Sequence, residues 1–138
     1  MKTYIGTKQV KAEPMNELAA VENGYARKNE DNHEWREGYH VQYTNPDGST
    51  YDSWSPKSVF EQAYKCADSP LDRLQIELSE VKARFKALEP MFSKGFDHVA
   101  GKVGYKQAAM LVAQCYLMQG YLEILEARID NFKPNEVE

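Results

Sequence analysis

Cysteine is scarce in this sequence, and its scarcity argues against a disulfide-stapled fold. The chain has 138 residues and two cysteines, Cys66 and Cys115. Small secreted domains rely on several bridges, which two cysteines cannot supply. We therefore expect two ordinary buried thiols in a reducing, cytosolic compartment.

An excess of positive charge is also missing. Lys and Arg number 17 against 21 Asp and Glu, which leaves a net charge of -4. Sequence-independent DNA binding needs a basic face, so we expect no DNA partner, although single basic pockets for a small anion remain open. We also find no signal-peptide core at the N-terminus and no apolar run that approaches membrane-spanning length. The expected setting is the cytoplasm, with no membrane partner.

Catalytic and metal-binding patterns are absent as well. The three histidines, His33, His40 and His98, lie far apart and have no ligand spacing with cysteines or carboxylates. No phosphate-binding loop, nucleophile elbow or dinucleotide fingerprint occurs. We expect no metal, no cofactor and no enzyme activity. An enzyme whose catalytic groups lie far apart in sequence would leave no such pattern and stays an alternative.

The residues that are present change character near residue 67, which predicts an α+β protein with a β-rich module over 1–66 and a helical hairpin over 67–138. In the first half, Asn45-Pro46-Asp47-Gly48 is a strong turn between two alternating segments, 38–43 and 49–54. These segments predict a β-hairpin. We also expect an extended run over 2–15, a short helix capped by Asn16, a solvated loop over 25–37, and a helix that Ser55 caps and Pro56 begins.

The second half has two apolar stripes at alternating spacings of three and four residues. Ser69-Pro70 marks the start of the first helix, and Pro90 limits it to about residue 89. A loop is expected over 93–104 because it contains three glycines, and a second helix over 105–132. Matching stripes on two helices predict an antiparallel helical hairpin, which we expect to be oligomeric. The stripes are Leu71, Leu74, Leu78, Val81, Phe85, Leu88 and Phe92, and then Leu111, Cys115, Met118, Leu122, Leu125, Ile129 and Phe132.

The second helix has more apolar surface than one partner helix can cover. Met110, Leu117, Tyr121 and Ile124 form a second stripe, and Arg128 extends its line. A helix that is apolar on two sides must bury the second side. Packing on the N-terminal module and a symmetric oligomer interface both satisfy this need, and both can hold together.

Aromatic rings beside cations are the side chains expected to hold a nucleotide, through stacking and charge-assisted hydrogen bonds. Arg128 is the best candidate, because a guanidinium in line with an apolar stripe needs a specific partner or an anion. The full set of candidates for ligand binding is Arg128, Tyr121, Arg84, Lys86, Tyr105 and Lys102.

The N-terminal half resembles a short module common in small bacteriophage and prophage proteins. The resemblance rests on Tyr4-Ile5-Gly6-Thr7-Lys8, Val10-Lys11-Ala12-Glu13-Pro14-Met15 and Ser53-Trp54-Ser55-Pro56-Lys57. This module precedes different C-terminal domains, and one of them looks like the Thoeris anti-defence proteins that sequester cyclic ADP-ribose signals.

The C-terminal half resembles the phage anti-CBASS cyclic-nucleotide sponges. The matching residues include Leu71-Asp72-Arg73-Leu74, Glu77-Leu78 and the stretch 121–129, which closes on Leu-x-x-Arg-Ile. Those proteins are helical hairpins that assemble into compact oligomers and bind cyclic di- or trinucleotides between subunits without cleaving them. The resemblance implies a homo-oligomeric phage protein of immune evasion in the host bacterial cytoplasm, with Arg128 and Tyr121 at the ligand.

Two other functions stay open at this point. The exposed helical face of the hairpin would also suit a protein-interaction module that inhibits a host protein. The third alternative is an enzyme that degrades the same signal. The sequence does not choose between cyclic dinucleotides, cyclic trinucleotides and cyclic ADP-ribose derivatives.

Overall fold

The computed structural model describes residues 1–28 and 34–132. The chain divides into two compact units, Met1–Lys65 and Cys66–Glu138. The first contains a three-stranded antiparallel sheet with two short helices, and the second contains helices. The predicted α+β class is confirmed. Part of the loop expected over 25–37, including His33, lies outside the described residues.

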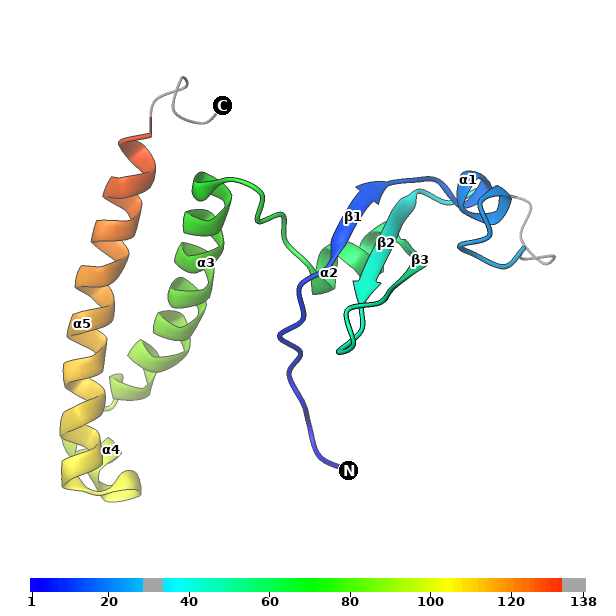
Figure 1. The fold of residues 1–138 in the computed structure, drawn as a ribbon. Helices are drawn as coiled ribbons and strands as arrows, with labels where there is room; N and C mark the ends of the chain where they lie inside the picture. The colour runs from blue at the N-terminus through cyan, green and yellow to red at the C-terminus, as the bar shows by residue number, and fades with distance from the viewer. Residues whose placement is uncertain (29–33, 133–138) are drawn as a thin grey trace. The chain divides into compact units, whose positions relative to one another are not determined.

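The sheet of the first unit has the order β1-β2-β3 (Figure 1). Its strands are β1 (Lys11–Pro14), β2 (Gly38–Thr44) and β3 (Thr50–Pro56). The predicted hairpin is β2 and β3, paired from Gly38↔Pro56 to Thr44↔Thr50. At its tip Gly48 has a φ of 89°, a value that glycine adopts without steric cost, and its N–H donates to Asn45 O.

Two helices accompany the sheet, α1 (Glu17–Glu22) and α2 (Lys57–Ala63). The cap predicted for α1 is confirmed, because Asn16 Oδ1 accepts from Ala19 N at 2.9 Å. The cap predicted for α2 is wrong. Ser55 and Pro56 belong to β3, α2 begins at Lys57, and no side chain caps it.

The extended run predicted over 2–15 pairs with the sheet only at its end, from Lys11 to Pro14. Lys11 lies opposite Gln42, and β2 ends two residues later at Thr44. Residues before Lys11 therefore have almost no strand left to pair with. Residues 1–10 form no strand, so only Lys11–Pro14 of the expected run belong to the sheet.

The core of the first unit lies around β2 and Trp54. Val41 is fully buried, and Trp54 Nε1 donates to Met15 O at 2.7 Å. Gly38 is required here, because a Cβ at this position would clash with Ser55 O and the Trp54 ring. The buried carboxylate of Glu17 is held by Arg36, with Nη2 and Oε2 2.8 Å apart, so its charge is paired inside the unit.

The second unit is built on α3 (Pro70–Leu88) and α5 (Tyr105–Asp130), which run antiparallel side by side (Figure 1). The predicted start of α3 is confirmed as a full capping box. Asp72 N donates to Ser69 Oγ at 3.0 Å, and Ser69 N donates to Asp72 Oδ2 at 3.1 Å. A 3₁₀ turn, η1 (Glu89–Phe92), follows α3.

Both predicted apolar stripes form the core between α3 and α5. All fourteen positions are buried or half-buried. The centre of this core consists of Leu74, Val81, Leu122 and Leu125. Both cysteines were expected to be buried. Cys115 is half-buried in the stripe, but Cys66 is exposed, so the expectation is wrong for Cys66.

The prediction of a loop over 93–104 is wrong, because most of this segment is a third helix, α4 (Phe96–Val103). Gly95 and Gly104 border this helix with φ values of 93° and 90°. Phe96, Val99 and Val103 have the spacing of one helix face, and Val99 is buried. The glycines therefore mark the two ends of a helix.

Among the described residues, one helix is long and apolar enough to cross a membrane by length and composition alone, and this helix is α5. The sequence analysis expected no apolar segment of membrane-spanning length, and α5 corrects that expectation. The same test is passed by core helices of soluble proteins, and α5 packs one side on α3. The finding is weak evidence for a membrane segment.

Candidate ligand-binding groove

Helix α5 is apolar on two sides, and only one of them is covered by α3. The second stripe identified in the sequence is exposed: Leu117 by 75%, Ile124 by 59%, and Met110 and Tyr121 by less. From 107 to 122 the helix has no Asp, Glu, Lys or Arg. An uncharged, exposed surface of this length favours contact with another molecule.

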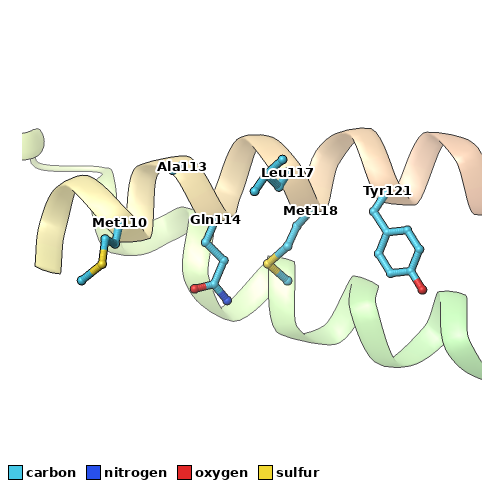
Figure 2. A pocket seen from close by; sticks show the side chains of 6 residues that line it. All are labelled: Met110, Ala113, Gln114, Leu117, Met118 and Tyr121. Atoms are coloured by element: carbon cyan, nitrogen blue, oxygen red, sulfur yellow. The ribbon is translucent and has the colours of Figure 1, made fainter.

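A groove of about 410 Å³ runs along this exposed side of α5 (Figure 2). We call it the α5 groove. Figure 2 shows the ring of Tyr121 and the side chains of Gln114 and Met118 reaching toward α3, with Leu117 directed away from it. The lining is otherwise apolar, so the groove suits a flat apolar ring with one or two hydrogen-bonding edges. Its lining residues are Met110, Ala113, Gln114, Leu117, Met118 and Tyr121.

An ion pair identifies the two flanks of the α3–α5 hairpin. Lys82 Nζ on α3 lies 3.7 Å from Glu126 Oε1 on α5, across one flank. Each helical residue turns about 100° from the one before. Arg84 therefore lies on the side of α3 away from Lys82, and Tyr121 lies on the side of α5 away from Glu126. Arg84 and Tyr121 share the other flank, where the α5 groove is.

Arg128 belongs to this same flank. It lies seven residues after Tyr121, which is two turns along α5 on one face, or about 10 Å. Arg84 and Arg128 are both exposed. In the part of the chain that the structure describes, neither guanidinium forms an ion pair. Two exposed cations therefore lie on the flank that carries the aromatic ring of the groove.

The other three predicted residues lie elsewhere in the second unit. Lys86 is on the opposite side of α3 from Arg84. Lys102 lies near the end of α4, and Tyr105 begins α5, about 35 Å along the helix axis from Arg128. Tyr105 contacts Phe96 edge to face, with ring centroids 5.0 Å apart. The structure thus places Tyr121, Arg84 and Arg128 on one flank of the hairpin, and Lys86, Lys102 and Tyr105 lie elsewhere in the unit.

A second groove of about 400 Å³ lies where α3, η1, α4 and α5 meet. Its lining includes three phenylalanines and one carboxylate, Glu89. Burial raises the pKa of the Cys115 thiol in this groove, and the charge of Glu89 adds to the rise. The carboxylate of Glu89 disfavours a phosphate, so an anionic ligand fits the α5 groove better.

Sequence reasoning missed two residues of the α5 groove, Gln114 and Ala113. Gln114 precedes Tyr121 by seven residues, so heptad spacing from Tyr121 would have identified it. Among residues 1–28 and 34–132, no cluster of three or more His, Cys, Asp or Glu is placed to bind a metal ion. The groove offers stacking and hydrogen bonding, and Arg84 and Arg128 bring positive charge to the same flank.

Comparison with known proteins gives one match, to the helical unit. The model of the Sequestin family matches residues 68–131, which include α3, α4 and α5. The family description fits a protein that sequesters a molecule. No curated protein and no solved structure matches the chain.

Proposed function

We propose that this chain is a bacteriophage counter-defence protein that binds a cyclic nucleotide immune signal and holds it without cleaving it. The signal is a cyclic di- or trinucleotide of CBASS or a cyclic ADP-ribose signal of Thoeris. The protein acts as a homo-oligomer in the cytoplasm of the host bacterium. The match of residues 68–131 to a family described as Sequestin supports the sequestering role.

The observation that carries this proposal is one aromatic ring in an apolar groove, with two exposed cations on the same flank that form no ion pair among the described residues. Tyr121 provides a stacking surface for a base, which contributes about 1–3 kcal/mol in proteins that bind single-stranded nucleic acid. Arg84 and Arg128 lie on the same flank, where their guanidinium groups match the geometry of phosphate oxygens. A net charge of -4 does not oppose such binding, because the cations are local.

Native mass spectrometry of the purified protein with cyclic dinucleotides, cyclic trinucleotides and cyclic ADP-ribose isomers tests the proposal. We expect one ligand class to stay bound to a discrete oligomer. Chromatography after heat denaturation should recover that ligand unchanged. Loss of the ligand on incubation would replace sequestration with degradation, and a ligand-free protein across the whole panel would contradict nucleotide binding.

Arg128→Ala should weaken the binding of the retained ligand by about tenfold to a hundredfold. A hydrogen bond to a charged group contributes about 1.5–3 kcal/mol, and each 1.4 kcal/mol is a factor of ten in affinity. The exposed position of Arg128 means that the helical circular dichroism signal should not change. Isothermal titration calorimetry measures the affinity.

Lys86→Ala is the matched control for this substitution. It removes the same charge from the same unit, but from the opposite side of α3. Affinity within about twofold of the parent is expected, because a distant exposed charge is screened by salt. Equal losses in the two variants would show a general charge effect and contradict the role of Arg128.

A second candidate function rests on the exposed stripe of α5. Leu117 and Ile124 are large, apolar and exposed by more than half of their surface. Such a surface also suits a helix of a host protein, which the chain would then inhibit. Capture of one host protein by the parent, and its loss in Leu117→Asp, would favour this function over the nucleotide.

A further inference from the structure

The second groove of the helical unit has a lining that differs in kind from that of the α5 groove. It lies where α3, η1, α4 and α5 meet, at the α4 end of the hairpin (Figure 1). Four aromatic rings line it, one from each of these elements: Phe85, Phe92, Phe96 and Tyr116. We call it the aromatic groove. Because its rings come from four segments, the groove exists only when these segments are packed together.

A single carboxylate gives the aromatic groove its charge. Among the described residues that line it, Glu89 is the only charged one. Glu89 lies seven residues after Lys82, so the two share one flank of the hairpin. Lys82 is paired with Glu126, whereas Glu89 belongs to none of the ion pairs in the described part of the chain. Lys86 precedes Glu89 by three residues but does not line the groove, so the carboxylate is available to a positively charged ligand.

The thiol of Cys115 reports the sign of the potential in the groove. Cys115 is half-buried and belongs to the lining. Burial raises the pKa of this thiol, and the charge of Glu89 raises it further. A field that opposes the formation of a thiolate favours a cation at the same place. The interior of the aromatic groove is therefore suited to positive charge.

We propose that the aromatic groove binds a small organic cation, an alkylated ammonium that lies against the rings and beside Glu89. The faces of aromatic rings attract cations, and several rings around one quaternary ammonium are a recurring mode of its recognition. A primary ammonium has three donors that all need acceptors, whereas alkyl groups on the nitrogen pack directly against ring carbons. The volume of about 400 Å³ lies in the range of small-molecule sites.

This inference goes beyond the proposed function, because the two grooves lie on opposite flanks of the hairpin. Gln119 of the aromatic groove precedes Glu126 by seven residues and shares its flank, whereas Tyr121 lies on the flank away from Glu126. Arg84 and Arg128 lie on the flank of the α5 groove, and a carboxylate lines the aromatic groove. The two sites therefore suit ligands of opposite charge, and each can be measured without the other.

Isothermal titration calorimetry of the full chain with benzyltrimethylammonium chloride and with choline chloride tests the site. We expect both cations to bind, one for each chain. The uncharged alcohol in which carbon replaces the nitrogen of choline has the same shape. It should bind at least about threefold more weakly, since it lacks the attraction of a cation to the rings. Equal affinity for choline and this alcohol, or no binding of either cation, would overturn the inference.

Glu89→Gln removes the charge and keeps the shape of the side chain. The affinity for benzyltrimethylammonium should fall about twofold to fivefold, the range of exposed ion pairs. Glu80→Gln is the matched control and should keep the parent affinity. Glu80 is also exposed, and it precedes Glu89 by nine residues, which places it on the opposite side of α3. Equal effects of the two substitutions would contradict the role of Glu89.

Tyr116→Leu removes one ring and keeps an apolar side chain. Because Tyr116 is 73% exposed, the helical circular dichroism signal should not change. The affinity for benzyltrimethylammonium should fall about twofold to fivefold, while the uncharged alcohol should bind as it does to the parent. A cation affinity that is unchanged in both Tyr116→Leu and Glu89→Gln would overturn the inference.

Alkylation of the two cysteines locates the bound cation. Saturating benzyltrimethylammonium should slow the reaction of Cys115 with iodoacetamide and leave that of Cys66 unaffected, because Cys115 lines the groove and Cys66 does not. Mass spectrometry of the digested protein measures both rates. Equal slowing of both cysteines, or no slowing of Cys115, would overturn the site. A chain that binds the cation but no nucleotide would refute the proposed function and leave this inference standing, and the converse result would do the opposite.

Discussion

At the scale of single residues, helix caps depend on contacts between near neighbours in the sequence. Asn16 and Ser69 cap helices as predicted, because a side-chain oxygen needs only the next three residues to form its bond. The helix start predicted at the similar Ser55-Pro56 pair is wrong. Pro56 lies opposite Gly38 in the sheet, so a long-range strand pairing took precedence over a local helix start.

His40 is a titratable residue of the first unit that lies between two carboxylates. Its Nδ1 lies 2.9 Å from Glu13 Oε1 and its Nε2 lies 2.7 Å from Asp52 Oδ1. The Tyr25 ring stacks on the imidazole at 4.2 Å between centroids. Hydrogen bonds to Glu13 and then to Asp52 raise the pKa of His40 above its ordinary value. Protonated His40 therefore favours the folded unit.

The stability of the first unit should fall as the pH rises. The contribution of His40 is complete below the ordinary histidine pKa of about 6.5 and is lost as the pH passes the raised pKa of the folded chain. Both tryptophans, Trp35 and Trp54, lie in this unit, so urea unfolding followed by tryptophan fluorescence reports it. His40→Gln should flatten the change in stability between about pH 6 and about pH 9, the range in which a histidine with a raised pKa loses its charge.

His98→Gln serves as the control for this pH dependence. His98 is an exposed residue of α4 in the other unit. The parent profile should persist in this variant. If His40→Gln kept the full pH dependence, the Glu13–His40–Asp52 contacts would not be its cause.

At the scale of elements, α4 is the helix that the sequence analysis did not predict. Three glycines in twelve residues pointed to a loop, yet Gly95 and Gly104 only border the helix. Gly101 lies inside it, and its cost is offset by burial of Val99 against the rest of the unit. Local propensity was a poor guide because tertiary packing decides short helices.

Gly104→Ala should destabilise the second unit by about 1–3 kcal/mol, because its φ of 90° and ψ of 154° belong to a region that only glycine occupies readily. Far-ultraviolet circular dichroism during urea unfolding measures the loss. Gly101→Ala has ordinary helical geometry and open space, so it should be neutral or stabilising by up to about 1 kcal/mol. Equal effects of the two substitutions would contradict this account of α4.

At the scale of the whole molecule, the chain is two compact units with separate cores. The first is built around Val41 and Trp54, and the second around Leu122 and Leu125. Tryptophan fluorescence reports only the first unit, whereas most helical signal comes from α3 and α5. These two probes can therefore follow the two units separately in one protein.

Gly38→Ala should lower the urea midpoint measured by tryptophan fluorescence and leave the circular dichroism midpoint nearly unchanged. The added methyl group clashes with Trp54 and Ser55 O, and overpacking of this kind costs about 1–3 kcal/mol. Gly6→Ala, where a Cβ meets nothing, is the control. Coincident shifts of both midpoints in Gly38→Ala would mean that the units unfold as one.

The sequence by itself determined the β-hairpin, the two long helices and the core stripes of the helical unit. Turn chemistry and heptad spacing are properties of neighbouring residues, so they can be read without a structure. Tertiary structure alone decided that α4 is a helix, that Gly38 must admit the Trp54 ring, and that Arg84 shares a flank with Tyr121 and Arg128. Each of these depends on contacts between segments distant in sequence, whose register no local pattern specifies.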